Sequence, residues 1–166
     1  MTTPHATQTQ PGAIGAEERL AALGLALPAA PKPVAAYVPF VRTGKLVYVS
    51  GQIPMREGNL IHQGRVGNEV SPEDGIACAR QCAINGLAVV RDALGSLDRV
   101  ARVVRLGVFV ACDAGFHDQP RIANGASQLM LDVFGEAGRH ARAAVGASDL
   151  PLGAPVEIEF LFEAAE

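Results

Sequence analysis

The run RVVRLGVFVA at residues 102–111 constrains the fold more than any other part of the chain. Its β-branched and aromatic residues favour a strand, and apolar side chains at consecutive positions indicate that both faces of that strand are covered. The closing segment VEIEFLF, residues 156–162, alternates instead. Strand side chains point alternately to opposite faces. One face is therefore lined by Val156, Ile158, Phe160 and Phe162, and the other carries Glu157 and Glu159.

Two helices are expected to cover one face of this sheet. The first spans residues 71–95, with Ser71 as a good N-cap, Pro72 at the first helical position and Gly95 as the terminator. The second spans residues 118–138, with Asp118 as its cap. Each carries an apolar stripe at helical spacing, which marks the side that packs on the sheet.

The remaining segments complete the order β-β-β-α-β-α-β-β. Residues 37–54 read as a hairpin that turns at Gly44, residues 59–66 as a short third strand, and ARAAVG at 141–146 as a further strand. The prediction is an α+β fold, a mixed sheet with two helices on one face. The opposite face would then be bare, so we expect other copies of the chain to cover it.

The chain is predicted to divide at residue 37. Residues 1–36 form an N-terminal extension made of a mobile tail, a short helix at 16–25 and a proline-rich connector, and residues 37–166 form the compact domain. We expect deletion of residues 1–30 to leave assembly and activity largely intact.

Composition narrows the classes of function. The 166 residues are 49% hydrophobic and 19% charged, which is typical of a globular protein. The net charge of -3 argues against a nucleic-acid partner, and no apolar run approaches the ~20 residues of a membrane span. Three cysteines and four histidines lack metal-ligand spacing. We therefore expect a cytoplasmic protein without a metal or cofactor.

Arg142 and Glu157 are the strongest candidates for chemistry. An arginine without an obligatory partner is a receptor for a carboxylate, whose two oxygens its planar fork can bind. A nearby acid can orient a water or move a proton if its pKa is shifted towards neutrality. The alternative is a salt bridge between Arg142 and Glu157 that joins two strands. Glu159 is expected to be structural.

These residues also carry a resemblance to a known family. YVSGQIP at 48–54, the capped helix containing ARQCAIN, the VFV strand and finally ARAAVGASDLPLGAPVEIE resemble the RidA family, also called YjgF or L-PSP. The resemblance implies a chorismate-mutase-like fold assembled as a homotrimer with clefts between subunits. It also implies hydrolysis of reactive 2-imino and enamine acids to 2-keto acids and ammonia, without a cofactor.

The resemblance implies roles for individual residues. Arg142 would bind the substrate carboxylate and Glu157 would position or activate the attacking water. Tyr37 and Ser50 would line the pocket, and Gly51 would offer its backbone N–H to the carboxylate. Ala144 stands where many relatives have cysteine, and the family role there belongs to the backbone carbonyl. The chain departs from many relatives at 111–115, where it reads ACDAG.

Three functions follow from these observations. The favoured one is a trimeric 2-imino/enamine acid deaminase. The alternative is a non-enzymatic protein that binds or senses 2-keto acids or other small carboxylates in the same cleft. An endoribonuclease or translation inhibitor, which some family labels suggest, is disfavoured because the sequence offers no basic groove with interleaved aromatic residues.

Overall fold

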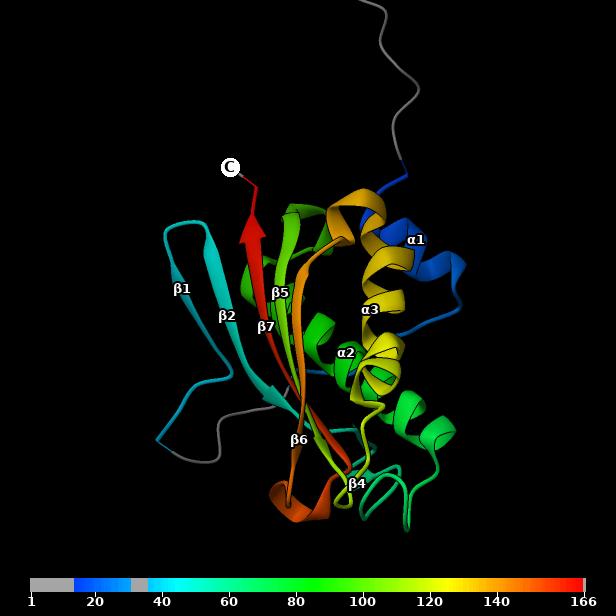
Figure 1. The fold of residues 1–166 in the computed structure, drawn as a ribbon. Helices are drawn as coiled ribbons and strands as arrows, with labels where there is room; N and C mark the ends of the chain where they lie inside the picture. The colour runs from blue at the N-terminus through cyan, green and yellow to red at the C-terminus, as the bar shows by residue number, and fades with distance from the viewer. Residues whose placement is uncertain (1–13, 31–35, 166) are drawn as a thin grey trace, which may run out of the picture.

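The computed structural model describes residues 14–30 and 36–165. It has a five-stranded sheet in the order β1-β2-β7-β5-β6, with α2 and α3 on one face (Figure 1). The elements are α1 (Ala16–Ala22), β1 (Phe40–Thr43), β2 (Leu46–Gln52), β3 (Met55–Arg56), β4 (Asn59–Leu60), α2 (Pro72–Leu94), η1 (Leu97–Arg99), β5 (Val100–Ala111), α3 (Gln119–Phe134), η2 (Gly135–Gly138), β6 (Ala141–Ala147), η3 (Pro151–Gly153) and β7 (Val156–Ala164).

The sheet is mixed, as predicted. β5 and β6 are parallel. The other three neighbouring pairs, β1–β2, β2–β7 and β7–β5, are antiparallel. β1 and β6 are the two edges. The connection from β5 to β6 runs through α3, which is the usual way to join two parallel strands. The α+β class and the two covering helices predicted from the sequence are confirmed.

Local sequence signals explain the helix boundaries. The Ser71 hydroxyl accepts a hydrogen bond from the Asp74 backbone N–H at 3.1 Å, and Gly95 ends α2 with φ of 83°. α3 begins after Asp118 as predicted, but the side chain of Asp118 makes no capping bond. α3 also ends at Phe134, and the chain continues as the 3-10 turn η2 rather than as helix to residue 138.

The core lies between the sheet and the two helices. β7 alternates as predicted: Ile158 and Phe162 are fully buried against the helices, while Glu157 and Glu159 point to the other side and are half-buried. We call the side of the sheet covered by α2 and α3 the helix face. The other side, which carries Tyr48, Glu157 and Glu159, is the open face.

The predicted third strand is wrong. Of residues 59–66, Asn59–Leu60 pairs with Met55–Arg56 in a separate two-stranded sheet, and Val66 forms only isolated bridges with Val70 and Cys112. A tight turn at Glu57 and Gly58, with φ of 52° and 83°, folds these two segments on each other. The two short strands therefore pair with each other and not with the main sheet, and the chain that follows touches the main sheet at a single bridge, between Val66 and Cys112.

The short helix α1 packs on the rest of the molecule. Its Leu20 is only 3% exposed and belongs to the hydrophobic core. The Glu17 carboxylate accepts a hydrogen bond from the Leu97 N–H at 2.9 Å, and the Glu17 N–H donates to the Asp98 carboxylate at 3.1 Å. Loss of α1 would remove Leu20 from the core and break these bonds, and the expected effect of deleting residues 1–30 stays a prediction. The tail before residue 14 lies outside the described residues, as do residues 31–35 of the connector.

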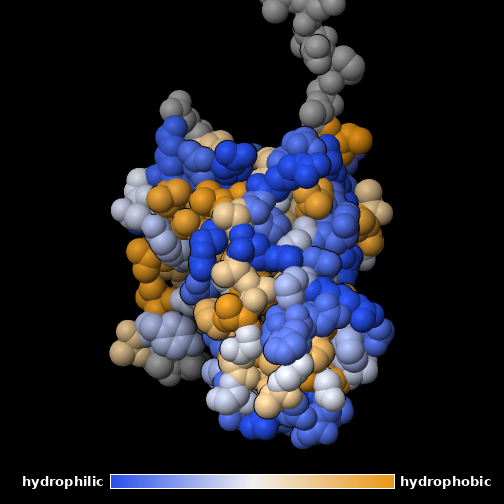
Figure 2. All heavy atoms as spheres, viewed as in Figure 1, coloured by the Kyte–Doolittle hydropathy of each residue, from blue (hydrophilic) through white to orange (hydrophobic). Residues whose placement is uncertain are grey.

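The open face of the sheet exposes apolar side chains in one copy of the chain. Val41, Tyr48 and Val145 are 54%, 48% and 47% exposed, and Figure 2 shows apolar surface over the β1–β2 hairpin. A hollow of about 400 Å³ lies on this face, lined by Tyr48, Arg105 and Leu161 among others. Within the described ranges, no helix is long and apolar enough to cross a membrane.

Candidate functional site

The site residues predicted from the sequence fall into two groups, one on β2 and β7 and one on β6. In the first group, β2 bulges at Ser50 and Gly51, between its register positions Val49 and Gln52. The bulge brings the Gly51 backbone directly against the Glu157 carboxylate, so that a methyl group on Gly51 would collide with Oε1. Bulges commonly re-aim backbone and side chains beside functional sites.

Ser50 ties the bulge to the segment that carries Tyr37. Its hydroxyl donates to the Val38 carbonyl at 2.7 Å, and its backbone N–H donates to the Pro39 carbonyl at 3.0 Å. Towards a ligand, the Ser50 oxygen is therefore an acceptor. Tyr37 is 59% exposed. Together with Gly51, these residues line a cavity of about 290 Å³, which is also lined by Asn85 and by Pro28 and Ala29 of the N-terminal extension.

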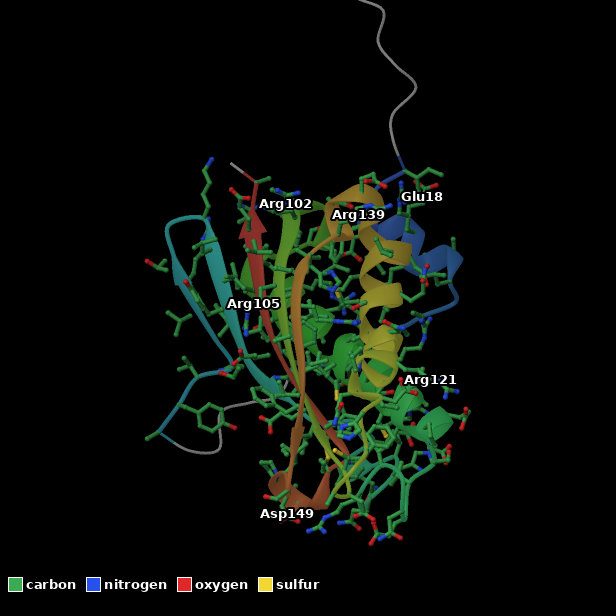
Figure 3. The ribbon with its side chains drawn as sticks, in the orientation of Figure 1. Glu18, Arg102, Arg105, Arg121, Arg139 and Asp149 are labelled. Carbon is green, nitrogen blue, oxygen red and sulfur yellow. The ribbon has the colours of Figure 1, made fainter. Side chains whose placement is uncertain are left out.

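Two neighbouring carboxylates on the open face have different environments. Glu159 forms an ion pair with Arg105, with an N–O distance of 2.7 Å, and Figure 3 shows Arg105 on the side of the sheet away from α3. Glu157 has no such partner among the residues that the structure describes. Burial, and then the negative charge of Glu159, raise the pKa of Glu157 above its usual value. Glu157 is therefore the carboxylate suited to take a proton.

The second group lies on the edge strand β6. Arg142 extends over α3, where its guanidinium donates to three acceptors: the Asn124 side-chain oxygen at 2.9 Å, the Ser127 hydroxyl at 3.0 Å and the Pro120 carbonyl at 3.2 Å. These bonds use both N–H groups of Nη1 and one of Nη2. Two donors, on Nε and Nη2, have no partner in the described part of the chain. A carboxylate that is bound bidentately accepts two such hydrogen bonds.

Ala144 lies on the same face of β6 as Arg142 and packs against the core. The Ala147 carbonyl accepts a bond from the Cys112 N–H on the β5 side. Carbonyl directions alternate along a strand, so the carbonyl of Ala144 points to the free edge of the sheet. A backbone acceptor is therefore present at this edge whether residue 144 is alanine or cysteine.

Arg142 and Glu157 do not meet within one copy of the chain. Arg142 is opposite Leu106 in the β5–β6 register, and Leu106 is fully buried on the helix face. Glu157 is opposite Phe109, which lies on the open face. The alternative of an Arg142–Glu157 salt bridge between strands of one chain is therefore wrong.

Asn124 and Ser127 are site residues that the sequence reasoning missed. They lie three positions apart on α3, beside the buried stripe of Ile122, Ala126 and Leu129. A polar pair at this spacing occupies one side of a helix, and this signal could have indicated that α3 holds a charged group. The sequence alone could not show that this charged group is Arg142, because that depends on how β6 pairs with β5.

The described residues contain no group of three or more His, Cys, Asp or Glu side chains arranged to hold a metal ion. Cys78 and Cys82 are buried on α2, and burial raises the pKa of the Cys78 thiol to about 12. Neither thiol is suited to act as a nucleophile at neutral pH. The predicted site itself offers an arginine, a carboxylate, a serine hydroxyl and the backbone around them.

A mixed sheet with two covering helices, a bulged strand beside an unpaired carboxylate and an arginine on the free edge define a chorismate-mutase-like α+β protein with a small polar site. The family model described as "YjgF/chorismate_mutase-like, putative endoribonuclease" matches residues 17–164. The chain therefore belongs to this family, the RidA-like proteins. The match begins in α1, before the boundary that we predicted at residue 37, and that boundary stays a prediction.

Individual relatives match most of the chain. It is 47% identical to Protein TCP17 of Trypanosoma cruzi over 142 residues, which is 85% of this chain and 89% of that protein. It is 32% identical to a 2-iminobutanoate/2-iminopropanoate deaminase of Dermatophagoides farinae over 136 residues, or 81% of this chain and 91% of that protein. The crystal structure of Atu1372 from Agrobacterium tumefaciens, a protein of unknown function, is 45% identical with a TM-score of 0.84 and covers 91% of this chain and 92% of its own.

Proposed function

We propose that the protein hydrolyses 2-imino and enamine acids of the 2-aminoacrylate type to 2-keto acids and ammonia, in clefts between the copies of a cytoplasmic homotrimer. The observation that carries this proposal is the state of Arg142. Its guanidinium is fixed by three acceptors on α3, two of its donors are directed to no described partner, and it lies on an unpaired sheet edge. A rigid fork of this kind is a receptor for a small carboxylate.

The reaction needs only the groups that the site offers. With the carboxylate on Arg142, a water attacks C2 of the imine, Glu157 takes a proton from that water, and the C–N π electrons move to nitrogen, which takes a proton from solvent. The resulting carbinolamine collapses as its hydroxyl loses a proton to solvent and the C–N bond breaks, giving a keto group and ammonia. Glu157 returns its proton to the departing nitrogen. Fixing the substrate beside an oriented water accounts for catalysis by proximity.

The remaining predicted residues have roles consistent with their positions. Ser50, whose hydroxyl already donates to Val38, can accept an N–H of the imine. Gly51 keeps Glu157 in place and offers its backbone N–H to the carboxylate. The outward carbonyl of Ala144 can bind the attacking water or the leaving nitrogen, and Tyr37 lines the cavity.

Assembly is part of the proposal, because Arg142 and Glu157 face opposite sides of the sheet. The free edge of β6 and the exposed apolar residues of the open face, among them Val41, Tyr48 and Val145, are surfaces that a neighbouring copy can cover. We expect a homotrimer in which Arg142 of one copy and Glu157 of the next share a cleft. A stable monomer in sedimentation at micromolar concentration would contradict it.

The direct test generates 2-iminopropanoate and 2-iminobutanoate in situ with an amino-acid oxidase and follows trapping of the imine by semicarbazide. The protein should compete with the trap and lower the yield of semicarbazone, and Arg142→Ala should not. If the protein binds 2-ketobutyrate through Arg142 but never competes with the trap, the non-enzymatic carboxylate binder is the correct function. An Arg142→Ala variant with normal binding and activity would exclude both.

A further inference from the structure

A second layer of side chains lies behind Arg142. His140 is half-buried between η2 and β6, in the turn that Arg139 marks in Figure 3. Its Nδ1 is 2.6 Å from the Gly138 carbonyl oxygen, and its Nε2 is 3.0 Å from the Ser127 hydroxyl. The same hydroxyl accepts the bond from Arg142 Nη1 at 3.0 Å. The four groups form one continuous chain of hydrogen bonds.

The direction of this chain follows from which atoms can donate. A carbonyl oxygen only accepts, so Nδ1 of His140 must carry a hydrogen. In the neutral ring Nε2 is then an acceptor, and the Ser127 hydroxyl donates its single hydrogen to it. The lone pairs of Ser127 are left for Arg142, so that every bond runs from Arg142 through Ser127 and His140 to Gly138.

The surroundings favour the neutral form of the ring. Burial, and also the positive charge of Arg142, lower the pKa of His140, while the bond to the Gly138 carbonyl raises it; the net shift is downward. The other charged groups on the elements around the ring are Arg139 and Glu136 near η2, Arg121 and Asp132 on α3, and Arg102 and Arg105 on β5. Arg139 pairs with Glu136, Arg121 with Glu73 and Asp118, Asp132 with Gln128 and Arg80, and Arg105 with Glu159.

We propose that His140 is a positioning residue for Arg142: the neutral imidazole orients the Ser127 hydroxyl, which fixes the guanidinium on α3 with its free donors ready for a carboxylate. The use of those donors rests on the proposed function; the positioning itself does not. Protonation of His140 would turn Nε2 into a donor and place a second positive charge one hydroxyl away from Arg142. Substrate binding should therefore weaken on acidification, separately from any loss of the base Glu157.

Two variants remove the relay at different points. Ser127→Ala deletes the hydroxyl, and His140→Phe deletes the acceptor but keeps a ring in the turn. Loss of one net hydrogen bond in the relay should raise KM, and Kd for 2-ketobutyrate, by about 3- to 10-fold with kcat little changed. The double variant should be no worse than the more affected single variant, because both break the same chain. His117→Phe, at an exposed histidine, is the matched control.

A readout without substrate separates this proposal from the proposed function. The guanidinium NMR signals of Arg142, assigned by their loss in Arg142→Lys, should be sharp in the wild-type protein. They should broaden in Ser127→Ala and His140→Phe, and in the wild type as the His140 ring titrates with acid. Melting temperatures identify any variant that has simply lost its fold.

The outcomes are distinct. Arg142 signals that ignore Ser127→Ala and the titration of His140 would overturn the positioning role, whatever the enzyme does. Signals that respond as expected, in a protein that neither hydrolyses imines nor binds 2-ketobutyrate, would support the positioning role and exclude the proposed function. An equally large rise in KM in the control variant His117→Phe would also overturn the positioning role of His140.

Discussion

Arg142 and Glu157 lie on opposite faces of the same sheet, with β5 between their strands. Neither can turn to the other without leaving its own packing: Arg142 is bonded to α3, and Glu157 rests against Gly51. A reaction that uses both residues on one substrate must therefore take them from two copies of the chain. The predictions for each residue differ because their surroundings differ.

Arg142→Lys should abolish function despite keeping the charge. An ammonium cannot bond three acceptors on α3 and also grip a carboxylate with two parallel donors. We expect kcat/KM to fall by about 10²-fold or more, and calorimetric binding of 2-ketobutyrate to be lost with it. Arg80→Lys, at a 3.9 Å ion pair on α2, is the control and should behave as wild type. Normal 2-ketobutyrate binding by Arg142→Lys would contradict the role given to Arg142.

Glu157→Gln should separate catalysis from binding. The amide keeps the size of the side chain but cannot take a proton, so kcat should fall by about 10²–10⁴-fold while bound 2-ketobutyrate survives. In the wild type, kcat should decline as pH falls through the pKa of Glu157, which lies above the usual 4.5 because of burial and Glu159. A pH profile of kcat that is unchanged in Glu157→Gln would show that another group is the base.

The same substitution has an expected effect on stability. Because the pKa of Glu157 is raised in the folded state, the folded protein binds this proton more readily than the unfolded chain. The free energy of unfolding therefore decreases as pH rises through the window between the two pKa values. Glu157→Gln should be slightly more stable than wild type at pH 7, and the difference should vanish in acid. Glu159→Gln, which loses the ion pair with Arg105, should show no such gain.

Gly51→Ala should damage catalysis through Glu157. The new methyl group would collide with the Glu157 carboxylate, and Gly51 is not among the glycines with positive φ, so the backbone itself tolerates alanine. We expect kcat to fall by about 10²-fold because the base is displaced. In a Glu157→Gln background, the same change should cost much less. If Gly51→Ala lowered kcat equally in both backgrounds, the substitution would act through another group, such as the backbone N–H of residue 51, and not through Glu157.

Leu20→Ala should destabilise the domain. The substitution leaves a cavity under α1 and should lower the free energy of unfolding by about 2–4 kcal/mol, measured in urea. Leu23→Ala, in the next turn of the chain and 39% exposed, should change it by less than about 0.5 kcal/mol. Equal melting behaviour of the two variants would show that α1 is as dispensable as its position in the sequence suggested.

The elements predicted correctly have strong local signals. α2 is bounded by a serine N-cap and a glycine in the left-handed region, and β7 alternates over its full length. The motif from Arg142 to Glu157 indicates the family from its residues and their spacing alone. Such features are set by a few neighbouring residues, which the sequence contains.

The features that were missed depend on distant segments. Alternation along a strand shows which side chains share a face, but not which face is buried. ARAAVG has small residues on both faces, so its sequence gives no sign of the buried side. Only its register with β5 places Arg142 over α3. The third strand failed because the turn at Glu57–Gly58 pairs its neighbours locally. α1 has seven residues and buries only one of them, Leu20. A single buried leucine does not produce a sequence pattern from which docking of the helix could be predicted.

Mixing two inactive variants should restore activity. Arg142→Ala chains keep Glu157, and Glu157→Gln chains keep Arg142, so a cleft formed between one of each can contain both intact residues. With random co-assembly after joint refolding, one of the four pairings at each cleft is complete, and about a quarter of the wild-type activity should return. The double variant Arg142→Ala/Glu157→Gln, refolded with either single variant, is the control and should restore nothing, because one of the two residues is then missing throughout. Mixing the assembled single variants without exchange should also restore nothing. If Arg142 and Glu157 instead act from one copy, the refolded mixture would stay inactive, and the shared cleft would be excluded.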